Sequence, residues 1–353
     1  MSNIITFRPK PKPTRASTFG ALAACVLHRR SQNDVYWLKE NAELLNLMVA
    51  LECRDVEGVL PLYAAFYDGI EDRLRFYPQY YRFFLSMCLD LEDLGMAGRK
   101  GQALCDWAAY EGLAETELSD LQRAEARRLL NRRGAAPAVG QGDLGRRLRR
   151  FVDRAETFAV PNRKAAYELT HVIFYLSDYG HRDPDLGTQA RLSLEYAGLL
   201  AFLDRDHDLL AEVCCAIRFC GGQPSPLWEA EVASAHRQIA PLESIGAGTG
   251  ADGYHAYLVT GWAAAVAERD SFAVTLPDPC AGFTDPRPRS GALRALSVGL
   301  LELGKARRGQ WGRMRGRLMS GLPQGCRDLL EQAEQSSPHF GSFFEGFARA
   351  ARP

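Results

Sequence analysis

Apolar residues recur at three- and four-residue steps along most of this chain, which is the spacing of an amphipathic helix. The segment 34–51 shows this spacing at Leu38, Ala42 and Leu45. A half-buried strand would alternate apolar and polar positions, and only residues 274–276 give a weak signal of that kind. The pattern therefore predicts an all-α protein of about 14–16 helices.

Caps, prolines and glycines set the expected ends of these helices. Helices are expected at residues 17–29, 34–51, 61–74, 78–95, 102–110, 118–130, 163–178, 187–203, 206–220, 226–237, 253–268, 292–303 and 325–335. The segment Asp204–His207 is expected to form a polar turn and helix cap, and Asp252 is expected to cap the helix that follows it.

Segments poor in large apolar residues divide the chain. Residues 1–17 are basic and proline-rich and lack the apolar stretch of a signal peptide, which predicts a disordered arm. The segment 135–145, rich in Gly and Ala, predicts a flexible loop. It separates two helical repeat regions, 18–134 and 146–353, that form either two units or one continuous domain.

Part of the chain repeats. The motif L-E-D-L-G at Leu91–Gly95 returns 85 residues later as L-S-D-Y-G at Leu176–Gly180, and further short matches keep the same order. Residues 80–134 therefore resemble residues 165–222. Helical units at a fixed spacing stack on their neighbours and bury their apolar faces. The repetition predicts helical hairpins arranged as a closed α/α toroid or as a curved α-solenoid.

One helix combines polar chemistry with an apolar setting. The expected helix at 163–178 carries Glu168, His171, Tyr175 and Asp178 at helical spacing, so these side chains point the same way. An imidazole beside a phenol and carboxylates is typical of an acid–base pair or of half a metal site. The alternative is a hydrogen-bonded core histidine with an aspartate in a helix cap.

The repeat separates these residues. Asp178 has a counterpart in Asp93, and a carboxylate in the last turn of a helix is disfavoured by the helix dipole. We therefore expect both aspartates to be held by an arginine or by backbone amides, which is a structural role. The residue that corresponds to His171 in the other copy is Ser86, so His171 departs from the repeat and is the stronger functional candidate.

A second histidine lies in the first turn of another apolar helix. The sequence Y-H-A-Y at Tyr254–Tyr257 contains His255. If this helix packs on the helix at 163–178, His171 and His255 meet, and a toroid would place both beside a central cavity.

The spacing Acid-x-x-His is a candidate metal-binding pattern. It occurs at Glu168–His171, Asp204–His207 and Asp252–His255. Glu-x-x-His from two helices of a bundle builds di-iron sites, but the last two pairs are expected at turns. A mononuclear site of His171 and His255 with one acid is the remaining metal alternative. We assign no metal, and the sequence identifies no cofactor.

Composition excludes other classes. Lys+Arg and Asp+Glu both number 43, so no net charge attracts nucleic acid, and no apolar run is long enough for a membrane span. The nine cysteines are scattered without C-x-x-C, which predicts buried free thiols in a reducing cytoplasm. The G-x-G-x-x-G motif at Gly248–Gly253 lacks a preceding strand and is expected to be a flexible loop.

The chain resembles an uncharacterised family of all-helical bacterial proteins. The resemblance rests on T-H-V-I-F-Y-L-S-D-Y-G at Thr170–Gly180 and on the later Y-H helix at Tyr254–Tyr257. It covers mainly residues 165–270, and more loosely residues 37–45 and 83–95.

This resemblance implies that His171, Asp178 and His255 are the positions of interest, and it implies no activity. Two hypotheses of function follow. In the first, the chain is an enzyme or small-molecule binder in which His171 and His255 act and Tyr175 and Asp178 orient them. In the second, it is a helical scaffold that docks a protein partner on its aromatic segment Phe76–Phe84.

Overall fold

The structure is a computed structural model. It describes residues 15–53, 56–136, 141–244, 252–268, 272, 276–284 and 291–349. Within these residues the fold is all-α, as the apolar periodicity predicted, with nineteen α-helices and one pair of two-residue strands.

The elements follow in chain order. They are α1 (Arg15–Ala23), a π-helical turn (Ala24–His28), α2 (Val35–Ala50), α3 (Ala64–Asp68), α4 (Ile70–Phe76), α5 (Tyr81–Asp93), α6 (Lys100–Tyr110), α7 (Leu113–Thr116), α8 (Asp120–Asn131), α9 (Gln141–Val152), α10 (Ala155–Phe158), α11 (Arg163–Leu176), α12 (Thr188–Asp204), α13 (His207–Phe219), α14 (Pro226–Gln238), β1 (Pro241–Leu242), α15 (Tyr254–Val266), β2 (Gly282–Phe283), α16 (Leu293–Glu302), α17 (Trp311–Gly321), α18 (Gln324–Ser336) and α19 (Phe340–Ala348).

There are more helices than the 14–16 expected because several are short. Helices α3, α7 and α10 contain five, four and four residues. A helix of one turn cannot display a three- and four-residue apolar period, so sequence patterns do not find it.

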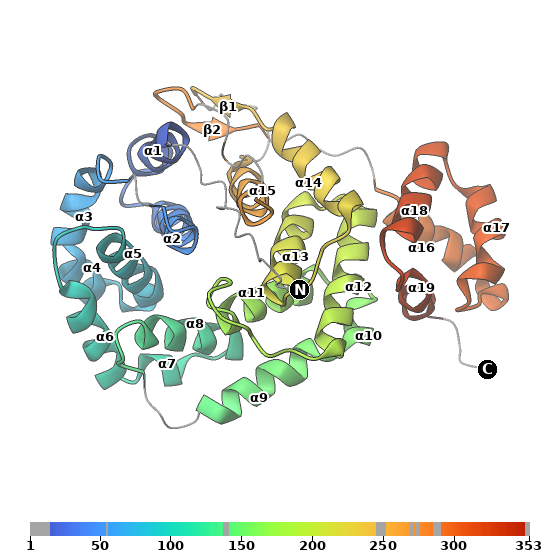
Figure 1. Cartoon of the computed structure of the whole chain (residues 1–353), viewed down its shortest axis with the longest axis horizontal. Coiled ribbons are helices and arrows are strands. Elements are labelled where there is room, and N and C mark those ends of the chain that lie inside the picture. Colours follow the sequence, from blue (N-terminus) through green and yellow to red (C-terminus); the bar gives the residue numbers. More distant parts are fainter. Residues whose placement is uncertain are drawn as a thin grey trace, which may run out of the picture.

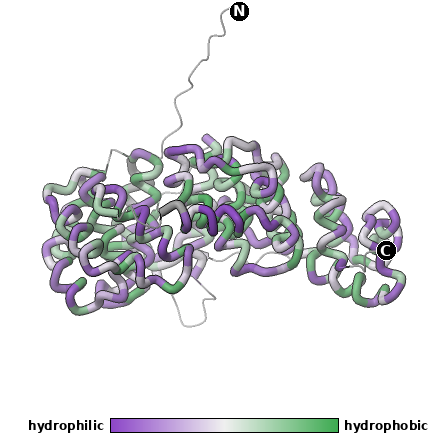
Figure 2. Tube along the Cα trace, turned by 90° about the horizontal axis from the view of Figure 1, so that it is seen from below, coloured by the Kyte–Doolittle hydropathy of each residue, from purple (hydrophilic) through white to green (hydrophobic). Residues whose placement is uncertain are grey.

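The helices α1–α15 follow a curved path that returns on itself (Figure 1). Helices α2, α5, α8, α11, α13 and α15 lie toward the middle, and α3, α4, α6, α7, α12 and α14 lie outside them. Each inner helix contacts the next one along this path, from α2 with α5 to α13 with α15. Helices α16–α19 form a lobe to one side, seen in Figures 1 and 2, that packs on α12 and α14.

Helix α13 is enclosed among α11, α12, α14 and α15, all of which it contacts. Every residue from Leu209 to Ile217 is buried. A helix with neighbours on all sides needs apolar residues on all faces, which explains the sequence L-L-A-E-V-C-C-A-I. The single acid in this run is Glu212.

A buried ion cluster around Arg29 joins the beginning of the path to its end. The guanidinium donates from Nε and Nη2 to Glu40 at 2.9 and 3.0 Å, and from Nη2 to Asp252 at 2.5 Å. The Arg29 side chain has no exposed surface. The Tyr254 hydroxyl also donates to the Glu40 carbonyl oxygen at 2.7 Å, so α15 is bonded directly to α2.

The position of Asp252 corrects one expectation. Gly253, not Asp252, is the N-cap of α15. The Asp252 carboxylate is engaged by Arg29 and by the backbone amide of Phe283 at 3.1 Å, and therefore does not cap the helix. By contrast, Asp206 caps α13 as expected, accepting from the amide of Leu209 at 3.3 Å.

Two segments expected to be irregular contain helix. Helix α1 begins at Arg15, inside the expected arm of residues 1–17, and α9 begins at Gln141, inside the expected loop of residues 135–145. Leu144 and Leu148 explain the second case, because they lie four residues apart and are both buried. Residues 1–14, 137–140, 248–251 and 274–275 lie outside the described part of the chain.

Helix α8 holds the aspartates at the ends of α5 and α11. Arg132 Nη2 donates to Asp93 at 2.7 Å, and Arg128 Nε donates to Asp178 at 2.7 Å. The repeat predicted that both aspartates are held by an arginine or by backbone amides, and an arginine holds each of them. The internal repeat itself stays a prediction, because another matched pair differs: Gly112 forms a left-handed turn, whereas Gly198 lies within α12.

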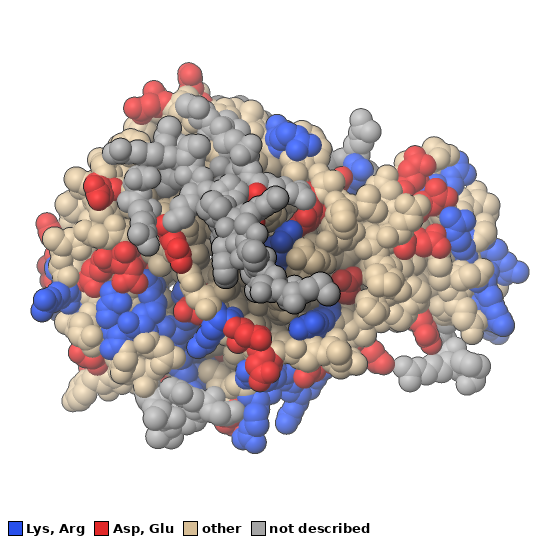
Figure 3. Space-filling model, in the orientation of Figure 1, with Lys and Arg blue, Asp and Glu red and all other residues tan. Residues whose placement is uncertain are grey.

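Acidic and basic side chains lie side by side on the face seen in Figure 3. None of the nine cysteines, all of which lie in the described part of the chain, forms a disulfide, and seven of them are buried. Among the described helices, none has both the length and the apolar character that crossing a bilayer requires.

The Arg29 cluster makes a testable prediction about stability. Arg29→Met leaves the carboxylates of Glu40 and Asp252 without their buried partner, which typically costs about 3–5 kcal/mol. Arg30 contacts the same acids but is 31% exposed, so Arg30→Met should cost at most about 1 kcal/mol. Urea unfolding of the two variants measures both losses. Equal losses would show that the buried contact carries no special share of the stability.

Candidate functional site

Four inner helices bring ionisable side chains to one place. Glu43 comes from α2, His171 from α11, Glu212 from α13 and His255 from α15. The charges of both histidines and of Glu212 act on the Glu43 carboxyl group, which places all four within electrostatic range. We call Glu43, His171, Glu212 and His255 the inner cluster.

His171 has a fixed ring orientation. Its Nδ1 lies 2.8 Å from the carbonyl oxygen of Tyr167 and 3.6 Å from Glu212 Oε2. A carbonyl oxygen can only accept, so Nδ1 carries the proton and Nε2 is left as the basic nitrogen of the neutral ring. No described residue hydrogen-bonds Nε2, and the side chain is 35% exposed.

Glu212 is the buried acid of the inner cluster, with 3% of its side chain exposed. Its Oε2 accepts a 2.6 Å hydrogen bond from the hydroxyl of Thr170, the residue before His171. This bond ties α13 to α11 at the level of the histidine.

His255 is oriented by Asp208, whose Oδ2 lies 3.0 Å from Nδ1 of the imidazole. Burial alone would lower the pKa of His255. The hydrogen bond to Asp208 and the charges of Glu43, Asp208 and Glu212 outweigh burial, and the pKa lies above its ordinary value of 6.5. Because Nδ1 is engaged, Nε2 is again the ring nitrogen left without a described partner.

Glu43 carries the least satisfied group of the inner cluster. Its Oε2 is buried and has no hydrogen-bond partner among the described residues, while Oε1 lies 3.7 Å from Lys39 Nζ. Burial raises the pKa of this carboxyl, and Glu212 raises it further. The positive charges of Lys39, His255 and His171 only partly oppose that shift.

Tyr175 and Asp178 lie beyond the inner cluster along α11. The buried Tyr175 ring is 6.1 Å from the His171 ring in an edge-on contact, and burial raises the pKa of its phenol. Asp178 follows the end of α11 with φ of +49° and pairs with Arg128. Among the contacts of the described residues, Asp178 reaches neither histidine, so its part in orienting them stays a prediction.

A pocket of about 280 Å3 opens beside Asp208. It is lined by Arg163, Asp204, Arg205, Asp206, His207, Asp208, Ala235, Ile239, Ala256 and Thr260. Asp208, one member of the His255–Asp208 pair, lines this pocket. Ala256, the residue after His255 in the sequence, lines it as well. The pocket therefore reaches Asp208, whereas none of the four residues of the inner cluster lines it.

The di-iron and mononuclear metal sites considered from the sequence can be compared with the positions of the described side chains. Among the described residues, no three His, Cys, Asp or Glu side chains are arranged to hold a metal ion. Glu168, the acid of the Glu-x-x-His pair, lies 3.7 Å from Lys164 on the outer side of the turn.

A family model described as "Domain of unknown function (DUF6902)" matches residues 1–350 of the chain. The chain belongs to the DUF6902 family. Comparisons with curated proteins and with solved structures gave no match.

Sequence reasoning about this DUF6902 chain missed Glu43, Asp208 and Glu212. Glu212 had a signal, because it is the single acid in an unbroken apolar run of α13. Asp208 had a weaker one, since it lies in the first turn of the same helix, four residues earlier. Glu43 had none: in K-E-N-A-E-L-L it looks like any solvated acid of an amphipathic helix.

The Asp208–His255 contact predicts how the pKa of His255 responds to mutation. Asp208→Asn removes the charge that favours the imidazolium, so the pKa of His255 should fall toward or below 6.5. Imidazole carbon–proton NMR signals followed against pH measure it, and Glu231→Gln, which affects His207 instead, is the matched control.

The same contact also predicts the direction in which the stability of the fold changes with pH. A raised folded-state pKa means that the His255–Asp208 pair stabilises the fold below pH 6.5 and that this stabilisation is lost as pH rises through the folded-state pKa. The stability difference between the wild type and Asp208→Asn should therefore be larger at pH 6 than at pH 9. A difference that grows with pH would contradict this assignment.

Proposed function

We propose that the inner helices form an α/α toroid and that the inner cluster binds a small polar molecule and exchanges protons with it. His255 and Glu43 are the groups that transfer protons. Asp208 orients His255, and His171 and Glu212 complete the binding surface.

The observation that supports this proposal most is that the buried Oε2 atom of Glu43 has no hydrogen-bond partner among the described residues. A buried polar atom without a partner costs stability, and native proteins keep few of them. Glu43 lies among two histidines and a second acid, and burial raises its pKa. Groups arranged in this way are typical of sites where a ligand supplies the missing partner.

The two proton-transfer groups have complementary properties. The raised pKa of His255 makes it a stronger base than an ordinary histidine, and the raised pKa of Glu43 keeps its carboxyl group protonated to a higher pH than that of an ordinary glutamate. Environments that shift acid and base toward the working pH support proton transfer in both directions. The basic nitrogen of each histidine is Nε2, which no described residue occupies.

In this proposal the ligand enters through the pocket beside Asp208, because Asp208 both lines that pocket and pairs with His255. At about 280 Å3 it is near the lower limit of small-molecule sites. Its charged lining includes Arg163, which pairs with Asp206 at 2.9 Å, and His207, which pairs with Glu231 at 3.0 Å. These features favour a small polar molecule over an apolar one.

Glu43→Gln tests whether the ionised carboxyl group of Glu43 lowers the stability of the folded protein. Because the folded-state pKa of Glu43 is raised above 4.5, its ionised form destabilises the fold at higher pH. Gln carries no charge, so the variant should unfold about 1–3 °C higher than the wild type at pH 8, with the difference vanishing toward pH 4. Glu168→Gln, a variant on α11 outside the inner cluster, should show no such trend. A Glu43→Gln variant that is less stable at pH 8 would refute the interpretation.

The ligand itself is sought by thermal-shift screening of a panel of polar metabolites at pH 7. Compounds that stabilise the wild type but neither His255→Gln nor Glu43→Gln are expected. His339→Gln, at an exposed position of the C-terminal lobe, is the matched control. Shifts that persist in both inner-cluster variants would show that binding occurs elsewhere.

The scaffold alternative draws on the aromatic segment Phe76–Phe84, which the structure divides in two. Tyr81 and Phe84 are buried in the core, whereas Phe76 and Tyr77 are 74% and 45% exposed. The exposed rings contact each other at 4.6 Å. Docking of a protein partner on this segment stays a prediction.

A further inference from the structure

The C-terminal lobe carries a run of positive charge that the balanced composition of the whole chain hides. Residues 303–327 contain seven Lys and Arg residues and no Asp or Glu. The seven are Lys305, Arg307, Arg308, Arg313, Arg315, Arg317 and Arg327. In Figure 3 the basic side chains of the lobe gather along its outer edge, over α17. A cluster of one sign attracts oppositely charged partners even where the net charge of a chain is zero.

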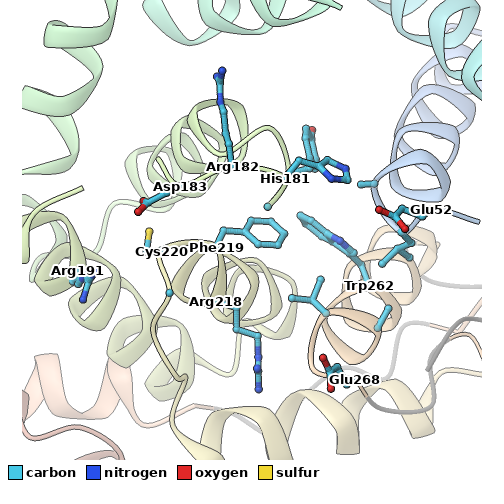
Figure 4. A pocket seen from close by; sticks show the side chains of 17 residues that line it. Glu52, His181, Arg182, Asp183, Arg191, Arg218, Phe219, Cys220, Trp262 and Glu268 are labelled. Carbon is cyan, nitrogen blue, oxygen red and sulfur yellow. The ribbon is translucent and has the colours of Figure 1, made fainter. Parts of the chain in front are cut away.

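Opposite charges lie together in other parts of the molecule. Around a cavity of about 760 Å3 beyond the ends of several inner helices, Figure 4 shows Arg218 beside Glu268. In the lobe, Arg315 is compensated in the same way, because it donates to Glu334 at 2.9 Å and to Glu331 at 3.2 Å. In the part of the chain that the structure describes, no carboxylate pairs with the other six cations of the run.

Helix α17 turns two of these cations to solvent. Its apolar residues Trp311, Met314 and Leu318 are buried in the lobe. The opposite face consists of exposed residues, namely Gly312, Arg313, Gly316, Arg317 and Ser320. Arg313 and Arg317 lie one turn apart on that face. Neither guanidinium group hydrogen-bonds or pairs with any described residue.

The turn before α17 adds two more cations. Lys305 is exposed, and its ammonium group has no described partner. Arg308 is also exposed, and its Nη1 donates to the backbone carbonyl oxygens of Lys305 and Arg307, both at 2.8 Å. These bonds orient the Arg308 side chain but leave its charge without a carboxylate to oppose it.

A groove of about 620 Å3 between α16 and α17 extends the charged surface to α16. Arg294 and Arg317 both line it, and Arg294 is exposed without a described partner. Glu302 is the one acid among the described residues that line the groove. Five exposed cations therefore share this side of the lobe. We call them the basic edge: Arg294, Lys305, Arg308, Arg313 and Arg317.

Gly312 and Gly316 bring the backbone of α17 to the surface beside these arginines. Glycine makes a helix less stable than alanine does, and a Cβ atom at either position would meet no atom within 4 Å. Packing inside the chain therefore does not require them. A helix face without side chains beside two arginines allows the backbone of a partner to approach closely.

The character of this face distinguishes among anionic partners. It carries no aromatic ring on which the bases of a single strand would stack. It also carries no apolar side chain to enter a bilayer, since the exposed Val298 and Leu301 belong to α16. Charge and N–H donors remain, and guanidinium groups bind phosphate oxygens through paired N–H groups.

We propose that the basic edge binds the sugar–phosphate backbone of a double-stranded nucleic acid without reading its sequence. Arg313 and Arg317 contact the phosphates of one strand, the glycines of α17 let that strand approach, and the other three cations extend the contact. The expectation that no net charge attracts nucleic acid applies to the chain as a whole and not to this lobe. The basic edge lies outside the inner cluster, so this binding does not depend on the function proposed there.

Fluorescence anisotropy with a labelled DNA duplex tests the proposal. Half-saturation is expected at about 1–100 µM protein, whatever the sequence of the duplex. With four or five phosphate contacts, the logarithm of the affinity should fall with the logarithm of the salt concentration with a slope of about −4. A duplex RNA of the same sequence distinguishes the two sources of this phosphate chemistry. No binding of either duplex at about 100 µM protein in about 50 mM salt, or an affinity that salt does not change, would overturn the proposal.

A triple variant locates the binding. Lys305→Gln, Arg313→Gln, Arg317→Gln removes three exposed cations, so the fold should be kept while the duplex binds at least about tenfold more weakly. The salt slope should become less steep by about 3, because each lost phosphate contact releases one counterion fewer. Unchanged affinity would place the contact elsewhere on the molecule and refute the basic edge.

A second triple variant controls for net charge. Arg75→Gln, Arg146→Gln, Lys164→Gln removes the same charge from side chains that are 78%, 77% and 86% exposed outside the lobe. It should bind the duplex within about twofold of the wild type. Equal losses in the two triple variants would show that the net charge of the chain, and not the basic edge, attracts the duplex.

Gly316→Leu tests the approach to α17 without changing any charge. Leucine favours a helix and the space beside Gly316 is open, so the variant should fold and bind about fivefold more weakly with the same salt slope. Unchanged affinity would show that α17 does not face the duplex. Sedimentation with vesicles that contain about 30% phosphatidylserine tests a membrane instead. Binding to these vesicles without binding to either duplex would overturn the proposal.

Discussion

The buried guanidinium of Arg29 is the contact on which the arrangement of the inner helices depends. It holds Glu40 of α2 and Asp252 before α15, residues more than two hundred positions apart, in one desolvated cluster. Glu40 lies one turn before Glu43, and Asp252 lies three residues before His255. The contact that closes the helical path is therefore also the contact that brings an acid of α2 to a histidine of α15. Stability of the fold and assembly of the inner cluster share one cause.

Local sequence patterns predicted much of this architecture. They could not predict which residues far apart in the sequence contact each other. The apolar period gave the helices, and the repeat led to the arginine partners of Asp93 and Asp178, because a carboxylate at a helix end needs compensation wherever it occurs. The two histidines were singled out by polar chemistry inside apolar runs. Glu43 could not be singled out, because its neighbours His171, Glu212 and His255 come from other helices, and no local spacing encodes that proximity. Helices α7 and α10 were missed because a single turn has no period.

The inner cluster also shows how a structural and a chemical role divide along one helix. On α11, His171 faces Glu212 of α13, while Asp178 turns back to Arg128 of α8. Both residues lie on one face in the sequence pattern, seven positions apart. The helix ends between them, and the left-handed turn at Asp178 redirects its carboxylate toward the neighbouring helix. Helical spacing alone therefore placed the Asp178 carboxylate on the same face as His171, although Asp178 lies beyond the end of the helix.

The direction of the inner helices gives the two ends of the molecule different electrostatic preferences. Residues just beyond the ends of α2, α11, α13 and α15 line one cavity of about 760 Å3, so the carbonyl ends of these helices lie together and their dipoles favour positive charge there. His255 lies at the opposite end, in the first turn of α15, where the dipole opposes protonation. Its pKa is nevertheless raised, which means that Asp208 and the acids of the inner cluster outweigh both burial and the dipole. A histidine whose pKa is raised against two opposing effects depends on each neighbouring carboxylate, so its pKa should respond to any ligand that neutralises one of them.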